Sequence, residues 1–330
     1  MRNSTVGSFA YKIFRIVNAF AKKSPPRMAV ILAVLMYGVT VMVVPTALNI
    51  NAISTLFLLT MLLSFVSAGQ TIVMIGGGLD FTVGAVMSVS AIITTVVMQG
   101  QDGLFFRAFV IAIAFGAAVG LLNGVTTSKI GLPALVVTLV IGNVVNRMSY
   151  ILTGGNPTGN AGRAFVTSVT YRYFGVIPSL TLYALIIFPL MFYILYRSRY
   201  GKQLYLTGNN PVAAKLSGIN VDRVKIMSYV ISGVLSAFTG MLGAGMMHSA
   251  RNMMFDAYAY NSLIAVVVGG TSFAGGIGTY GGTIAGAAVM VVLNNMLTAM
   301  NLSSSIREIA LGTVLVFLLA MYNRKKAVRQ

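Results

Sequence analysis

The chain has 330 residues, of which 57% are hydrophobic and only 8% are charged, and it contains no cysteine. Soluble proteins carry roughly 25% charged residues, so this composition excludes a soluble domain as well as a disordered or disulfide-stapled chain. The formal net charge of +18 comes from 23 basic and five acidic residues. Such an excess is typical of a nucleic-acid-binding protein, or of a membrane protein whose basic loops face the cytoplasm.

The N-terminal segment 1–27 is basic, and apolar residues recur within it at helical spacing. A segment of this kind is expected to lie along the cytoplasmic surface of the membrane. Ser24-Pro25-Pro26 ends it, and the apolar run 28–44 that follows has no small-residue cleavage site. We therefore predict an uncleaved first span rather than a signal peptide.

Long apolar runs continue along the rest of the chain, each long enough to cross a hydrocarbon core about 30 Å thick. They predict an all-α, polytopic membrane bundle of about ten spans, with 28–330 as one transmembrane domain and both termini cytoplasmic. Most of the 23 basic residues then fall in cytoplasmic segments, which supports this orientation and argues against nucleic acid as a partner. The predicted spans lie at 28–44, 53–75, 79–99, 104–126, 132–152, 179–197, 224–247, 258–274, 282–300 and 306–322.

Two glycine-rich segments, 76–84 and 269–282, interrupt the apolar runs. The first places Asp80 next to three consecutive glycines, and an ionisable group bordering an apolar run is costly, which makes it a functional candidate. Glycines allow a helix to unwind, and the broken ends can face a substrate path. The alternative role for Asp80 is a cap or turn at the membrane boundary. The two segments lie in opposite halves of the chain, which would suit a duplicated architecture.

Neutral polar residues occur within several predicted spans. An unsatisfied amide in lipid costs several kcal/mol, so these side chains should face protein or a water-filled path. Amides and hydroxyls suit the hydroxyl groups of a sugar, whereas their alternative role is a hydrogen bond between helices, worth about 1 kcal/mol. The candidate path residues are Gln70, Asp80, Thr82, Asn123, Asn143 and Asn294.

Glycines also recur at intervals of four in two stretches, and this spacing lets neighbouring helices approach closely. The two series are Gly116, Gly120 and Gly124, and Gly278, Gly282 and Gly286.

The sequence contains no legible catalytic or metal-binding constellation. His248 is the only histidine, whereas a metal site needs several converging ligands and a general base needs an oriented partner. No P-loop pattern is present, and the G-x-G-x-x-G at 276–281 lies between spans without a preceding strand. We therefore expect a transport subunit rather than an enzyme, with no cofactor or metal of its own. The remaining acids should cap helices or lie in loops: Asp102, Asp222, Asp256 and Glu308.

A basic loop at 197–225 separates two predicted spans. Asn210 followed by Pro211 is a good helix start, because Asn accepts from free backbone N–H groups and Pro suits the first helical position. Gly218 suits the left-handed position that ends a helix. The loop should therefore contain a short helix, which is either an ordinary connection or a docking element for a cytoplasmic partner.

Several motifs occur in the order found in ribose-type ABC sugar-importer permeases. The loop from Tyr200 to Lys225, with its T-G-N-N-P-V-A-A-K-L-S-G-I-N-V sequence, resembles the cytoplasmic loop of that family. Gly77–Gly84 resembles the family's GG-I-D-L-S-V-G segment, and Val266–Gly276 resembles its later glycine-rich motif. The resemblance covers residues 54–322, nearly the whole chain.

This resemblance implies a permease subunit of the bacterial inner membrane that carries a monosaccharide or a related small solute. ATP and Mg would be held by a separate cytoplasmic ATP-binding subunit, docked on a coupling helix at 209–219. A second permease copy or homologue, a periplasmic sugar-binding protein and membrane lipid would be the other partners. The coupling residues would be Asn209, Asn210, Pro211, Ala213, Ala214, Lys215, Ser217 and Gly218.

The chain departs from the family pattern at one place. Before the second glycine-rich motif the family usually carries E-L-D, whereas this chain has Ala259-Tyr260-Asn261. The loss of two acidic side chains leaves the solute open and is compatible with a divergent or heterodimeric permease. Two alternatives stay open: a related permease for nucleosides or branched-chain amino acids, and a secondary transporter in which Asp80 couples transport to an ion or a proton.

Overall fold

The computed structural model describes residues 25–156 and 159–303, together with residues 306, 307, 309, 312 and 313; this part is helical apart from one short hairpin. The predicted surface segment 1–27, the tenth predicted span and the C-terminus lie largely or wholly outside the described residues. The main helices are α2 (Pro25–Val43), α3 (Ile50–Ile75), α4 (Val83–Met98), α5 (Phe105–Ser128), α6 (Ala134–Thr153), α7 (Arg163–Thr170), α8 (Leu180–Phe192), α9 (Arg199–Asn209), α10 (Pro211–Leu216), α11 (Val221–Met247), α12 (Ala257–Val268) and α13 (Tyr280–Ala299).

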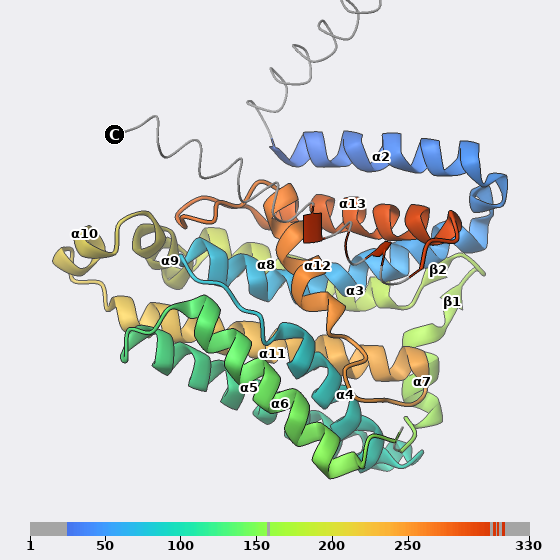
Figure 1. The fold of residues 1–330 in the computed structure, drawn as a ribbon, viewed down its shortest axis with the longest axis horizontal. Helices are drawn as coiled ribbons and strands as arrows, with labels where there is room; N and C mark the ends of the chain where they lie inside the picture. The colour runs from blue at the N-terminus through green and yellow to red at the C-terminus, as the bar shows by residue number, and fades with distance from the viewer. Residues whose placement is uncertain (1–24, 157–158, 304–305, 308, 310–311, 314–330) are drawn as a thin grey trace, which may run out of the picture.

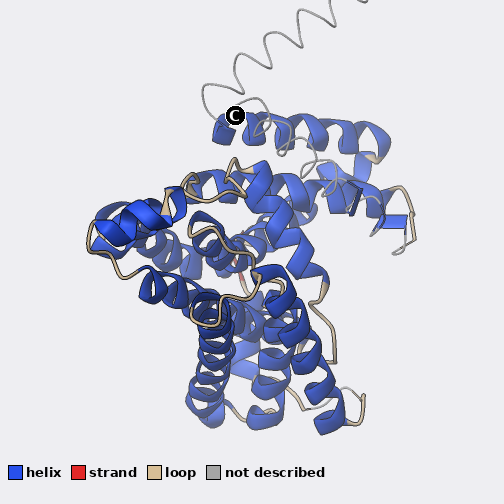
Figure 2. Ribbon diagram, turned by 60° about the vertical axis from the view of Figure 1, so that its left-hand side comes forward, coloured by secondary structure: helices blue, strands red, loops and turns tan. Residues whose placement is uncertain are grey.

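Shorter elements complete the described chain. Two 3-10 turns, η1 (Pro45–Leu48) and η2 (Asp102–Leu104), precede α3 and α5, and a π turn, η3 (Tyr193–Arg197), prolongs α8. Strands β1 (Arg172–Tyr173) and β2 (Ile177–Pro178) pair antiparallel. Figure 2 shows how completely helices dominate the described chain.

Six helical runs in the described part are long and apolar enough to cross a membrane. They correspond to α3, η2 with α5, most of α6, α8 with η3, α11 and α13. Helices α2, α4 and α12 are also apolar but shorter. The prediction of an all-α membrane bundle is confirmed, whereas the complete set of ten spans remains a prediction.

The spans predicted at 79–99 and 258–274 are longer than the helices found there. Helix α4 begins only at Val83, and α12 already ends at Val268. The early end of α12 has its physical reason in backbone conformation, because Gly270 has φ of +95°, which a residue with a Cβ rarely adopts. Gly77, with φ of +81°, likewise ends α3, and the backbone stays non-helical from there to Thr82. Each glycine follows the last turn of a helix and ends it.

Helices α3 and α12 end with the same hydrogen-bond pattern. The N–H of Gly78 donates to the carbonyl of Val73, five residues earlier, at 2.9 Å, and that of Thr271 donates to Val266 at 3.1 Å. This six-to-one bond across a left-handed glycine is the Schellman motif, which satisfies carbonyls that the helix leaves free. Both glycine-rich segments therefore leave their helices in the same way.

Helix α11 lies at the centre of the bundle, packed against α3, α4 and α5 (Figure 1). A Cβ added at Gly116 or Gly120 of α5 would collide with the carbonyl oxygens of Gly233 and Tyr229 on α11. The two backbones are thus in direct contact, as the glycine spacing predicts. Because lipid offers no hydrophobic drive for helix association, such close packing supplies much of the attraction between these helices.

Two of the three glycines in the second series, Gly278, Gly282 and Gly286, lie at a close contact between helices, as expected. On α13, a Cβ at Gly282 would collide with the carbonyl of Gly269, and one at Gly286 with that of Ala265 on α12. Gly278 lies before the start of α13 instead, where it packs against Thr271. Helix α13 therefore lies tightly on α12 through two glycines, and α2 covers it from the other side.

The two ends of the bundle carry different elements. Helices α9 and α10 project at one end, and α7 with the β1–β2 hairpin lies at the other (Figure 1). The end of α3 that carries Gly76–Gly78 lies at the α10 end of the bundle. This arrangement places both a short exposed helix and a glycine-rich segment at one end of the molecule.

Candidate functional site

Asp80 lies in the segment between α3 and α4 and is only 1% exposed. One carboxylate oxygen accepts from the backbone N–H of Thr82 at 3.0 Å and from its hydroxyl at 2.5 Å. The other accepts from the hydroxyl of Ser232 on α11 at 2.7 Å. The Asn123 amide of α5 donates to the Thr82 hydroxyl at 2.9 Å. This hydrogen-bond network ties the broken segment to α5 and α11, and both oxygens of the buried carboxylate have donors.

The candidate path residues do not all come together. Asp80, Thr82 and Asn123 share the network just described, whereas Gln70 is fully buried within α3 and its side-chain amide has no partner among the described residues. The other two lie elsewhere, each bonded to its own helix: Asn143 donates to Leu139 at 2.9 Å, and Asn294 to Met290 at 3.1 Å. The six residues are thus distributed over four places in the bundle.

Asn294 lies at the edge of a cavity of about 310 Å³ between α3, α12 and α13. The cavity wall is partly polar, because Asn261 and Asn295 line it with Asn294. The side-chain oxygen of Asn261 is buried and has no donor among the described residues. Asn261 stands where the family usually carries its second acid, so this replacement puts a neutral amide into the cavity wall.

The short helix expected in the basic loop is α10, and its start is as predicted. The side-chain oxygen of Asn210 accepts from the backbone N–H groups of Val212 and Ala213, each at 3.0 Å. Gly218 ends the helix with φ of +80°. Leu216 and Val212 are 85% and 69% exposed, so this helix presents apolar side chains outward from a basic loop.

Helix α9 connects α10 to both glycine-rich segments. A Cβ at Gly208 would collide with the carbonyl of Ile75 at the end of α3, and it would lie 2.6 Å from the backbone N of Gly276. The N–H of Gly276 donates to the same Ile75 carbonyl at 2.8 Å. The ends of α3 and α9 and the loop before α13 therefore meet backbone to backbone, in what we call the glycine junction (Gly208, Ile75 and Gly276).

Tyr205 of α9 adds a side-chain bond to this junction. Its hydroxyl donates to the carbonyl of Gly278 at 2.8 Å. Burial raises the pKa of Tyr205, which keeps the hydroxyl protonated and able to donate. This hydrogen bond ties α9 to the loop between α12 and α13.

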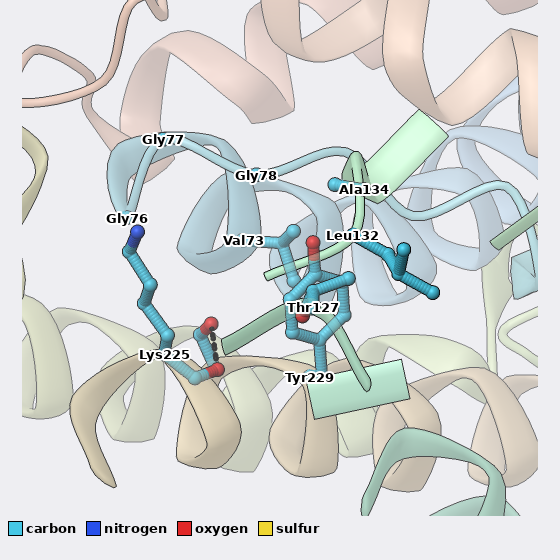
Figure 3. Close-up of a pocket in the computed structure, with 10 residues that line it drawn as sticks. Val73, Gly76, Gly77, Gly78, Thr127, Leu132, Ala134, Lys225 and Tyr229 are labelled. Carbon is cyan, nitrogen blue, oxygen red and sulfur yellow. Dashed lines mark hydrogen bonds between the residues drawn. The ribbon is translucent and has the colours of Figure 1, made fainter. Parts of the chain in front are cut away.

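A polar cavity of about 150 Å³ lies beside the first glycine-rich segment. Gly76–Gly78 form one wall and α11 another, and the hydroxyl of Tyr229 donates to the carbonyl of Leu79 at 3.3 Å. Figure 3 shows the Lys225 side chain extending toward Gly76, where a cation is favourable next to the C-terminus of α3. The cavity thus lies under the segment that carries Asp80.

Sequence reasoning missed several of these residues. Ser232 and Tyr229 lie on α11, more than a hundred residues from the segment they hold, and no local pattern marks them. Gly208 occurs in the T-G-N-N-P sequence of the loop, but its packing role depends on contacts with two other segments. The described residues contain no group of three or more His, Asp or Glu residues that could hold a metal ion.

Comparison with known proteins identifies the family to which the chain belongs. Residues 52–319 match the family described as "branched-chain amino acid transport system / permease component". The chain belongs to this permease family. With six helices of spanning length among the described residues, it is a multi-pass membrane permease.

Among the relatives, sugar permeases are prominent. The chain is 29% identical to the ribose import permease protein of Escherichia coli K12, over 86% of this chain and 88% of the relative. It is 30% identical to the ribose import permease protein of Bacillus subtilis 168, over 79% and 81%. It is 29% identical to the galactose/methyl galactoside import permease protein of Escherichia coli K12, over 86% and 90%. No solved structure matches the chain.

Proposed function

We propose that the chain is the permease subunit of an ABC importer in the bacterial inner membrane, carrying a monosaccharide or a related small solute. The observation that carries this proposal is the similarity, over most of the chain, to permeases for ribose and for galactose. The complete subunit would have about ten spans with both termini in the cytoplasm. It would work with a second permease copy or homologue and with a periplasmic binding protein that delivers the solute.

Helix α10 is the proposed docking element for a separate ATP-binding subunit, which would hold ATP and Mg. Leu216 and Val212 are exposed in a loop outside the bundle, and burying such side chains against a partner is favourable by about 1.5–3 kcal/mol each. Asn209, Asn210, Pro211, Ala213, Ala214, Lys215, Ser217 and Gly218 form and flank this helix and are the proposed coupling residues. The glycine junction would transmit its movement to both glycine-rich segments.

The translocation path would follow the short helices α4 and α12. Non-helical backbone flanks both, at 76–82, 248–256 and 269–279. At membrane depth such backbone is tolerated only where it is buried in protein or lines a water-filled cavity. In this proposal Asp80, Thr82, Asn123 and Gln70 support the wall of the path, whereas Asn143 and Asn294 reach its surface.

The docking assignment is tested by replacing Leu216 with Asp. A charge at this exposed apolar position should weaken binding of the permease to its cognate ATP-binding subunit. Co-purification and ATP-driven uptake should therefore both fall at least about tenfold. Phe174→Asp, at an equally exposed apolar position in the hairpin at the other end, is the matched control for co-purification. Normal co-purification of the Leu216→Asp variant would contradict the assignment of α10.

A permease for branched-chain amino acids is the second candidate, because the matching family carries that description. The two candidates differ in the solute bound by the cognate periplasmic protein. Calorimetric titration of that protein with D-ribose, D-galactose and L-leucine separates them: heat from a sugar supports the preferred function, and heat from leucine alone supports the second.

A further inference from the structure

A second small cavity, of about 130 Å³, lies between the start of α4, the middle of α6 and the start of α12. We call it the α6–α12 cavity. Two aromatic rings form one side, with the centroids of Phe81 and Tyr260 5.7 Å apart and the ring planes at 67°. The cavity is lined by Phe81, Ala85, Leu139, Gly142, Asn143, Asn146, Asp256, Ala259 and Tyr260.

The polar side of the cavity is formed by a carboxylate and two amides. The Asn146 amide nitrogen donates to both oxygens of Asp256, each at 3.1 Å. Asp256 was expected to cap a helix or lie in a loop; it directly precedes α12, yet its side chain caps nothing there. It is aimed at α6 instead. The side-chain oxygen of Asn146 is buried and has no donor among the described residues.

The backbone that carries Asp256 is held against α4. The N–H of Phe255 donates to the Ser88 hydroxyl at 2.9 Å. A Cβ added at Gly84 would lie 2.8 Å from the Asp256 Cα, so the two backbones are in contact. The carboxylate is therefore positioned before any ligand arrives, as binding sites require.

The mouth of the cavity is polar and lies near the middle of α6, a helix long enough to span a membrane. Asn143 is exposed on α6, a helix of spanning length, and Tyr260 is 48% exposed beside it. An amide and a neighbouring carboxylate facing hydrocarbon would cost several kcal/mol. This face must therefore meet water or protein, as a translocation path would provide.

The cavity also contains one of the positions at which the chain departs from its family. Ala259 lines it, where the family usually carries the first acid of E-L-D. Asp256 lies three residues earlier, and residues three apart lie on the same side of a helical turn. The chain therefore lacks the family's carboxylate at position 259 and presents another into the same cavity, one turn away.

We propose that the α6–α12 cavity is a solute-binding site on the translocation path, and that its ligand is a neutral polyhydroxylated molecule. Asp256 would accept hydrogen bonds from solute hydroxyls, Asn143 and Asn146 would exchange further ones, and the rings of Phe81 and Tyr260 would pack against C–H groups. The inference rests on the proposed transport function and names the substrate class of that path.

The composition of the lining supports a neutral solute over an amino acid. A bound carboxylate is normally paired with a cationic side chain, and no Lys, Arg or His is among the nine lining residues. Arg147 follows Asn143 by one turn on α6 but does not line the cavity.

The test measures uptake by the complete importer, with its ATP-binding subunit and binding protein, in proteoliposomes. The probes are radiolabelled D-ribose, D-galactose and L-leucine. Asp256→Asn and Asn146→Ala should each reduce uptake of the transported sugar about tenfold or more, since each removes a strong hydrogen-bonding group. Assembly and basal ATP hydrolysis should stay at the wild-type level. Met148→Ala, an exposed side chain on α6 outside the cavity, is the matched control and should transport normally.

A second variant separates binding from mere structural support. In the Asp256→Asn background, Ala259→Glu returns a carboxylate to the cavity and should restore a substantial part of the uptake. Sugar uptake at the wild-type level in Asp256→Asn overturns the proposal, and so does loss of complex assembly together with uptake, which would make Asp256 a clamp between α6 and α12. If Asp256→Asn does not fold, Tyr260→Ala decides, and its normal uptake overturns the proposal.

The outcomes also distinguish this inference from the function on which it rests. If the wild-type importer and the Asp256→Asn variant take up sugar equally well, only the proposed binding site is contradicted. If the wild-type importer takes up leucine and neither sugar, both the proposed function and the site are contradicted.

Discussion

At the scale of single residues, Asp80 shows how a buried carboxyl group is held by its neighbours. Its two oxygens accept three hydrogen bonds, from Thr82 twice and from Ser232 once. Hydrogen bonds to a buried charge are worth more than neutral ones, and leaving such a charge unpaired is costly. The network therefore holds the non-helical segment in one position against α11.

Ser232→Ala tests the support of Asp80. Loss of one donor to a buried carboxylate should destabilise the chain by about 1.5–3 kcal/mol and lower the melting temperature of the detergent-solubilised protein. Ser228→Ala is the matched control, one turn away on α11, because its hydroxyl donates to the Lys225 carbonyl of its own helix and does not contact Asp80. Unchanged melting of Ser232→Ala combined with impaired uptake would instead indicate that Asp80 takes part in transport directly.

At the scale of elements, several helices of this chain are joined through glycines. The contacts between α5 and α11, and between α12 and α13, bring backbone against backbone. The glycine junction does the same for α9, α3 and the loop before α13, and it is the proposed route from the docking helix to the path. Contacts of this kind are rigid, since no flexible side chain intervenes to absorb a movement.

Gly208→Ala should uncouple the two ends of this route. Its Cβ would collide with the Ile75 carbonyl, so α9 must shift away from α3. We expect the ATP-binding subunit to remain bound and to hydrolyse ATP, while solute uptake falls at least about tenfold. Gly38→Ala, a helical glycine of α2 with open space around it, should transport normally. Coupled transport by Gly208→Ala would refute the role of the junction.

At the scale of the whole molecule, the two ends of the bundle should lie on opposite sides of the membrane. The chain has no cysteine, so single cysteines can be introduced without a background reaction. Ser217→Cys beside α10 should react with a membrane-impermeant maleimide only in inside-out vesicles. Phe174→Cys in the hairpin, at a position that is 94% exposed, should react in intact spheroplasts. Labelling of both from one side would contradict the predicted topology.

The sequence by itself determined the class of the protein, the helical character of its spans and the start and end of α10. These follow from local rules: lipid requires long apolar helices, Asn210 caps the first turn of α10, and Gly218 ends its last. Glycine spacing likewise predicted that α5 would approach another helix closely. The family motifs were readable for the same reason, since each is a contiguous run of residues.

Only the tertiary structure decided which residues act together. Asp80 and Ser232 are separated by 152 residues, and Asn146 and Asp256 by 110. No period or cap links such pairs in the sequence, because the packing of α4 and α6 against their neighbours brings them into contact. Local rules made Asp256 a cap or loop acid, and they left Asp80 open between a functional role and a structural one. The fold supplies both oxygens of Asp80 with hydrogen-bond donors. It also places Asp256 in the wall of a cavity, beside Ala259, where the family usually carries an acid.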